Sequence, residues 1–225
     1  MSFEPVLPPY NAGDPGASFL SSSCLDFLLI ELVPMAYRVT NELEAGARAR
    51  SLVQDEATPT SQTAASVAPS TAAAASTVGS AGAGKVLDDD DERDAVFYRL
   101  EMLGYRVGQG LVERFSRDRP RFHDTLDVIK FLCKDLWMLV FRKQVDNLKT
   151  NHRGVYVLTD NAFRPFQRMS TEAGGQAVVR AQPFLWFPCG IVRGALAALG
   201  ITATVHAESS ELPGAIFQIK TAAKA

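Results

Sequence analysis

The stretch LEMLGYRVGQGLVERFSRDRPRFHDTLDVIKFLCKD, residues 100–135, decides the fold of this chain. Its apolar side chains recur at helical spacing, at Val107 and Leu111 in the first half and at Ile129 and Cys133 in the second. Glycines punctuate the first half, and arginines crowd the segment between the two halves. The stretch therefore predicts a helix that continues through glycines, then a loop, then another helix.

Two glycines inside the first of these helices need an explanation. Gly108 and Gly110 each cost up to about 1 kcal/mol relative to alanine in a helix. Close approach of another backbone would offset that cost, and so would a loop that cradles phosphate. A phosphate loop follows a strand, whereas Val96, Leu100 and Leu103 indicate a helix before these glycines. We therefore expect another element to pack closely against Gly108 and Gly110.

Composition divides the chain into ordered and disordered parts. Residues 21–49 and 88–225 form a single predicted domain, which a flexible N-terminus, residues 1–20, precedes. Between positions 57 and 84 nearly every residue is Ala, Ser, Thr, Gly or Pro. Such a composition cannot bury enough apolar surface to offset the entropy of ordering, so residues 50–87 are predicted to be a disordered insertion.

Periodicity predicts further helices. One at Leu25–Ala36 has so little polar surface that we expect both of its sides to be covered. Asp124 is a candidate N-cap for a core helix over Thr125–Phe141, and a helix at Phe184–Leu199 is expected to end at Gly200.

Two pairs of strands are expected among these helices. Val155–Leu158 and Phe163–Met169 flank a turn signal at residues 160–161, which predicts a hairpin. Ile201–Ala207 alternates apolar and polar residues, and Ala215–Lys220 is another short β run. This order predicts an α+β fold in which helices pack on one face of a small, mostly antiparallel four-stranded sheet.

The composition gives no sign of nucleic-acid, metal, cofactor or membrane-spanning chemistry. The formal charge of −2 leaves no basic excess for a nucleic acid. Cys24, Cys133 and Cys189 lack metal-ligand spacing, and their odd number argues against a disulfide framework, so a reducing, cytosolic compartment is expected. The longest early apolar run, Phe27–Ala36, is far shorter than the roughly 20 residues of a membrane span.

Three residues invite a catalytic hypothesis. His152, Asp160 and Cys189 are the residue types that an activated thiol nucleophile uses. Cys189 lies in the apolar run FLWFPCGIVRG, however, where a thiol is usually an inert packing residue. We therefore predict that the protein is not an enzyme. Arg193, the only charge between positions 184 and 200, is expected to face water or to pair with a carboxylate.

Two helices carry more apolar surface than one small sheet can cover. They are the helix at Leu25–Ala36 and the one at Val96–Leu103. Large apolar side chains dominate the energy of protein interfaces, so this surplus predicts a protein partner. The candidate partner-binding residues are Leu28, Leu32, Met35, Tyr98 and Met102.

Four motifs in one order resemble a known family. They are GYRVGQGLVERF, DVIKFLCKDLW, DNLKTNHRGVYVL and CGIVRGALAALGI. Together they resemble the small subunits of the transport protein particle (TRAPP) tethering complex, and most of all its subunit-six branch, the thirty-three-kilodalton subunit of yeasts. The resemblance implies the same architecture and a non-catalytic scaffold that pairs with another small subunit. It also implies a complex that tethers vesicles in ER–Golgi and Golgi transport, associates peripherally with those membranes and activates a Rab-type GTPase by nucleotide exchange.

The resemblance also leaves an alternative function open. Some members of this superfamily carry a fatty acyl chain on a cysteine that follows an arginine. The matching pair here is Arg121 and Phe122, so the nucleophile is missing. The alternative is a lipid- or small-molecule-binding module with a hydrophobic tunnel between the helices and the sheet. We expect Phe122, Phe131 and Trp137 to narrow any such tunnel.

One prediction follows from the composition of the insertion. Replacing residues 50–87 with a short Gly/Ser linker is expected to leave the melting temperature nearly unchanged. Loop-closure cost changes by only about 0.6 kcal/mol per doubling of length. Calorimetry of the two proteins measures the difference. A fall of several degrees would show that the segment packs against the domain.

Overall fold

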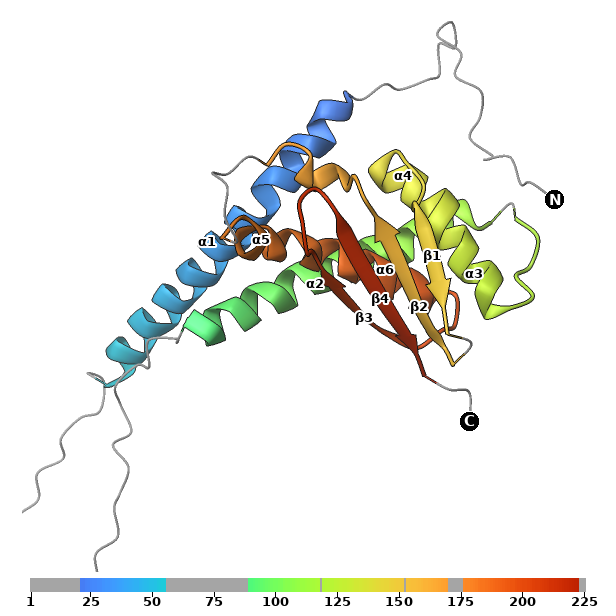
Figure 1. The fold of residues 1–225 in the computed structure, drawn as a ribbon. Helices are drawn as coiled ribbons and strands as arrows, with labels where there is room; N and C mark the ends of the chain where they lie inside the picture. The colour runs from blue at the N-terminus through green and yellow to red at the C-terminus, as the bar shows by residue number, and fades with distance from the viewer. Residues whose placement is uncertain (1–20, 56–88, 118, 152, 170–175, 223–225) are drawn as a thin grey trace, which may run out of the picture.

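The computed structural model describes residues 21–55, 89–117, 119–151, 153–169 and 176–222. Within them, helices cover one face of a four-stranded sheet whose strand order is β1-β2-β4-β3 (Figure 1). All three strand pairings in this sheet are antiparallel. The predicted α+β fold is confirmed.

The sheet turns one apolar face toward the helices. Its strands are β1 Asn147–Thr150, β2 Val155–Asp160, β3 Ala203–Glu208 and β4 Ala215–Thr221. Alternate residues of β4, namely Ala215, Phe217 and Ile219, are buried because successive side chains point to opposite faces of a sheet. Leu158 lies opposite Phe217 in the register and is buried in the same core.

The helices surround the other side of that core. They are α1 Ser22–Asp55, α2 Asp89–Phe115, α3 Thr125–Phe131, α4 Trp137–Phe141, α5 Gln176–Ala181 and α6 Trp186–Ala198. Short turns of other helix types join them: the π-helical turn η1 Leu132–Leu136 and the 3-10 turns η2 Arg164–Phe166 and η3 Gln182–Leu185.

The backbones of α2 and α6 touch where the two helices cross. A Cβ atom added at Gly108 would overlap the carbonyl oxygen of Ile191 and would lie 2.9 Å from the amide nitrogen of Ala195. The absence of a side chain is therefore what allows this approach. Glycines from both helices meet backbone atoms of the other helix in the same way: Gly104, Gly108, Gly190 and Gly194.

The two glycines singled out in the sequence play different roles. The close approach expected at Gly108 is confirmed. At Gly110 the same expectation is wrong, because this residue is exposed and an added Cβ would meet nothing within 4 Å. Gly110 lies on the side of α2 that faces away from α6.

The predicted hairpin is wrong in its second strand. Phe163–Met169 contains η2, and the strand that pairs with β2 in a hairpin is β1, across a turn at Gly154 with φ +80°. Phe163 and Phe166 are both buried, and their three-residue spacing suits a 3-10 turn, in which side chains three apart lie on one side. Pro165 also lacks the N–H that a strand inside a sheet would donate.

The first helix is longer than predicted. α1 continues through Pro34 and ends at Asp55, so residues 50–55 of the predicted insertion are helical. A linker variant that tests the disorder of the insertion should therefore begin after Asp55. The rest of the insertion and the predicted flexible N-terminus, residues 1–20, lie outside the described residues.

The predicted core helix over residues 125–141 contains a π-helical turn. Asp124 occupies the N-cap position of α3, but its side chain makes no cap hydrogen bond. At η1 the carbonyl oxygen of Cys133 accepts a hydrogen bond from the amide of Val145 at 3.0 Å. A carbonyl released from the regular helical ladder thus anchors the chain that leads into β1.

Replacing a glycine at the helix crossing tests this packing. Gly108→Ala is expected to lower the free energy of unfolding by about 1–3 kcal/mol, because the added methyl group cannot fit without moving two backbones. Each kcal/mol lowers the melting temperature of a domain of this size by roughly 2–4 °C, which calorimetry resolves.

The matched control is Gly110→Ala, two residues along the same helix. It is expected to raise the free energy of unfolding by up to about 1 kcal/mol, because alanine has the higher helix propensity and the site is open. Equal effects of the two substitutions would show that the crossing does not depend on the absence of a side chain.

Candidate partner-binding groove

A small apolar cluster joins α1 to the rest of the domain. Leu32, Val33 and Ala36 of α1 pack against Val96 and Leu100 of α2. All five side chains are buried, and the cluster also includes Trp186 at the start of α6. Along the chain, these contacts follow the apolar spacing of i, i+3 and i+4 that the sequence shows in both helices.

One polar link reinforces the same contact. The Nε of Arg99 in α2 donates a hydrogen bond at 3.0 Å to Oγ1 of Thr40 in α1. The Thr40 hydroxyl in turn donates to the carbonyl oxygen of Ala36 at 2.9 Å. Thr40 is buried, so both bonds satisfy a polar group that would otherwise be costly to remove from water.

α1 and α2 leave a groove of about 450 Å³ between their outer faces. Three large side chains on its rim are exposed: Met35 at 40%, Val39 at 37% and Tyr98 at 63%. The groove is lined by Leu32, Met35, Ala36, Val39, Ala95, Tyr98, Arg99, Leu100, Met102, Leu103 and Arg106. Its walls are therefore mostly apolar, with two arginines among them.

The structure brings four of the five predicted partner-binding residues to this groove. Met35, Tyr98 and Met102 line it and have accessible side chains. Leu32 also lines it, but it is only 5% exposed because it packs within the chain. Leu28 is 56% exposed and is absent from the lining, one helical turn before Leu32.

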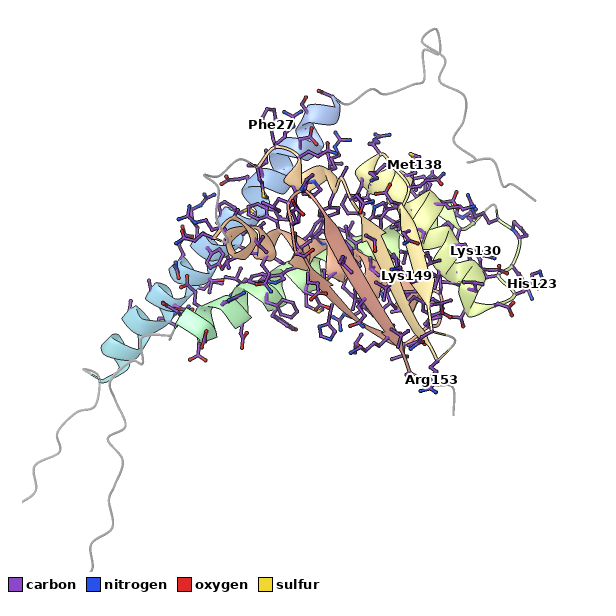
Figure 2. All side chains as sticks on the ribbon, viewed as in Figure 1. Phe27, His123, Lys130, Met138, Lys149 and Arg153 are labelled. Atoms are coloured by element: carbon purple, nitrogen blue, oxygen red, sulfur yellow. The ribbon has the colours of Figure 1, made fainter. Side chains whose placement is uncertain are left out.

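Sequence reasoning missed Val39, which lines the groove, and the exposed Leu43 four residues after it. Val39 and Leu43 are exposed, and they continue the spacing of four and three residues that runs from Leu28 through Leu32 and Met35. That spacing was readable, but the helix was predicted to end at residue 36. Within the described residues the chain itself covers only part of this helix, so the expectation that both of its sides are covered stays a prediction that needs a partner. Phe27, for example, is 68% exposed and projects from α1 away from the sheet (Figure 2).

An ion pair beside the groove ties α2 to α6. Arg193 Nη2 donates to Glu101 Oε2 at 2.7 Å, and the guanidinium lies over the Tyr105 ring, 4.9 Å from its centroid. The same Nη2 lies 3.8 Å from the sulfur of Met102. The expectation that Arg193 pairs with a carboxylate is confirmed. This pair compensates the charge of the largely buried Glu101.

The two described residues of the catalytic hypothesis, Cys189 and Asp160, are both buried. Burial, and to a smaller extent the charge of Glu101, raises the pKa of the Cys189 thiol to about 12, so it is not a thiolate at neutral pH. Asp160 is buried and accepts hydrogen bonds from Trp137 Nε1 at 2.9 Å and Lys143 Nζ at 2.6 Å. His152 lies outside the described residues.

The described residues hold neither a metal-site candidate nor a membrane-spanning helix. No group of three or more His, Cys, Asp or Glu side chains in them could hold a metal ion. None of the helices there is long and apolar enough to cross a membrane.

Comparison with known proteins identifies the family to which this chain is similar. The model of the family described as "Transport protein particle (TRAPP) component" matches residues 25–222. Trafficking protein particle complex subunit 6b of Danio rerio is 52% identical over 130 residues, which cover 58% of this chain and 82% of the relative. Subunit 6B of Homo sapiens is 54% identical over 121 residues, 54% of this chain and 75% of the relative.

A more distant match comes from a solved structure. It is a crystal structure of trafficking protein particle complex subunit 3 from Naegleria fowleri covalently bound to palmitic acid. It has a TM-score of 0.48 and 14% identity, and it covers 58% of this chain and 82% of that one. The family model covers all but the first four described residues, and the relatives above confirm the resemblance to the subunit-six branch. The chain therefore belongs to the TRAPP component family.

Proposed function

We propose that this chain is a non-catalytic scaffold subunit of a TRAPP complex and that it pairs with another small subunit of the same fold through the groove between α1 and α2. The observation that carries the proposal is the exposed apolar rim of that groove. Membership of the TRAPP component family supports the choice of partner.

The rim has the properties of an unfilled interface. Met35 and Val39 line the groove from α1, Tyr98 lines it from α2, and the exposed Leu43 follows Val39 along α1 outside the groove lining. Nothing in the described part of the chain covers them. Contiguous apolar surface rimmed by polar groups is typical of a protein–protein contact, and tyrosine and methionine are enriched in the buried centres of such contacts.

The charges of the groove favour a partner with carboxylates at its edge. Arg99 and Arg106 are exposed groove residues, and Arg106 forms no ion pair within the described part of the chain. Rim charges of this kind mainly steer association and fix register, while the apolar centre supplies affinity.

The wider role follows from the family. The paired chain would support a complex that tethers transport vesicles in ER–Golgi and Golgi traffic and promotes nucleotide exchange on a Rab-type GTPase. Its contact with membrane would be peripheral and made through the complex. Affinity purification of the tagged chain with mass spectrometry tests this assignment. Recovery of other TRAPP subunits supports it, and recovery of the chain alone contradicts it.

The packing of the core argues against the lipid-binding alternative. The Trp137 ring lies 4.5 Å from that of Phe141 and 5.1 Å from that of Phe217, centroid to centroid, in the layer between the helices and the sheet. The Phe122 ring, at the position of the missing cysteine, has its centroid 5.3 Å from that of the Phe131 ring. Close-packed aromatic rings thus fill part of the layer between the helices and the sheet, where the hypothetical tunnel would run.

Substituting Tyr98 tests the groove. Tyr98→Asp is expected to weaken pairing with the partner subunit by about 30-fold or more, because removal of a central interface anchor costs about 2 kcal/mol or more and each 1.4 kcal/mol is tenfold. Isothermal titration calorimetry with the purified partner subunit measures the affinity of pairing. Leu32 is unsuitable for this test, since a charge there would disrupt the packing of α1 on α2.

The matched control is Val179→Asp in α5. Val179 is 63% exposed, the same fraction as Tyr98, and it is not a groove residue. The Val179→Asp variant is expected to bind the partner subunit with unchanged affinity. Loss of affinity in the control but not in Tyr98→Asp would place the interface elsewhere.

A mass measurement tests the lipid-binding alternative and the thiols together. Burial raises the pKa values of both the Cys133 and the Cys189 thiols to about 12, whereas Cys24 is exposed. Protein from a eukaryotic host, treated briefly with maleimide at neutral pH, is therefore expected to gain one label and to carry no acyl group. A hydroxylamine-sensitive mass increase that matches a fatty acyl chain would revive the carrier function.

A further inference from the structure

A second pocket, of about 260 Å³, lies where α1, the end of α4 and η2 meet, at one end of the sheet (Figure 1). We call it the cationic pocket. Its charged lining residues are Asp26, Arg142, Lys143, Arg164 and Arg168. Four cationic side chains and one carboxylate therefore line the pocket. The pocket is separate from the groove between α1 and α2, because the two share no lining residue.

Two of the four cations already have close partners. Lys143 Nζ lies 2.8 Å from Asp146 Oδ2 and 2.6 Å from Asp160 Oδ1. Arg164 donates its Nε to Asp26 Oδ1 at 2.9 Å, a hydrogen bond that lowers the pKa of Asp26. These pairs fix the positions of both cations at the wall of the pocket.

The other two cations are poorly compensated. Arg168 Nη2 lies 3.5 Å from Asp26 Oδ2, so this one carboxylate serves two guanidinium groups. The side chain of Arg142 forms no hydrogen bond or ion pair with the described residues, although its backbone N–H donates to the carbonyl oxygen of Met138 at 3.1 Å. An anion in the pocket would be attracted by both, and an arginine offers a planar fork of N–H donors to it.

The backbone at Arg142 adds a second observation. Arg142 follows α4 at the C-cap with φ 62° and ψ 22°, in the left-handed region. Glycine or asparagine normally occupies such a position, because a larger side chain is strained there. A strained backbone is a feature of ligand-clamping residues, and here it sets a long cationic side chain on the pocket wall.

An apolar pocket of about 150 Å³ adjoins the cationic one. The two share Asp26, Arg164 and Arg168, and the apolar side is formed by Leu29, Ile30, Pro165, Met169 and Phe184. Ile30 is 45% exposed. A ligand with a negative group and an apolar part would thus find both complements side by side.

We propose that the cationic pocket binds a phosphate group. A phosphate carries up to two negative charges and several acceptor oxygens, which match the forks of Arg142 and Arg168 better than a single carboxylate does. The phosphate can belong to a soluble molecule, or to a phosphorylated lipid headgroup with Phe27 and Ile30 at the membrane interface. The chemistry at the two arginines is the same in both cases.

Two probes with the whole chain distinguish these sources. Inorganic phosphate is titrated into the protein and followed by phosphorus NMR. Vesicles of phosphatidylcholine, with and without a phosphatidylinositol phosphate, are tested by co-sedimentation at near-physiological salt. Saturable binding to free phosphate indicates a soluble ligand, and binding only to the phosphorylated vesicles indicates a lipid headgroup. The absence of binding to either probe would overturn the proposal.

The decisive variant is Arg142→Asn with Arg168→Gln. Asparagine tolerates the left-handed backbone at position 142, and Arg168 is an exposed side chain, so the fold is expected to persist. Affinity for the probe that binds is expected to fall at least about tenfold, since charge-assisted hydrogen bonds are lost. Arg168→Gln alone is expected to give a smaller loss in the same direction.

A control variant removes the same charge elsewhere. Arg153→Gln with Arg180→Gln replaces two exposed arginines, one after β1 and one in α5. It is expected to leave the affinity within about twofold. If the two double variants weaken binding equally, general attraction by surface charge explains the result and the cationic pocket is not a phosphate site.

Discussion

The backbone contact between α2 and α6 is the constraint on which the rest of this structure depends. Four glycines remove the side chains that would hold the two helices apart. Both helices therefore fit as one layer against the sheet, and α6 buries most of its length in the core. The outer side of α2 is left for α1, and the groove exists because α1 covers only part of that side.

The same contact gives α2 two chemically different sides. On the inner side, the carbonyl oxygens of Glu101 and Tyr105 approach Gly190 and Gly194, and Glu101 holds the arginine of α6. On the outer side, Tyr98 and other groove residues remain accessible. Because the inner side is fixed by backbone packing, the outer side is presented on a rigid support. A preorganised surface loses less entropy when a partner binds.

The parts of the fold that depend on local pattern could be predicted from the sequence. The helices, the last two strands, the close approach at Gly108 and the pairing of Arg193 with a carboxylate all follow from spacing and from the cost of burying polar groups. Gly110 was misjudged because a glycine carries no sign of whether another backbone lies beside it. Phe163–Met169 was misjudged because a run of aromatic residues suits both a strand and a buried 3-10 turn.

Which distant segments meet could not be predicted. The groove combines helices on either side of the predicted insertion. On the first of these helices, the exposed groove residue beyond the predicted end at residue 36, Val39, was therefore missed. The cationic pocket brings Asp26 to Arg142 and Arg164, and no local spacing relates these positions.

Pairing through the groove is tested most directly by hydrogen exchange of the amides of α1 and α2, measured in the chain alone and in the purified complex. Helical amides exchange through local opening, and a bound partner suppresses it. We expect slower exchange in the complex over residues 28–43 and 95–106, with little change over the outer face of the sheet. Unchanged exchange in both segments, with protection appearing elsewhere, would contradict the account.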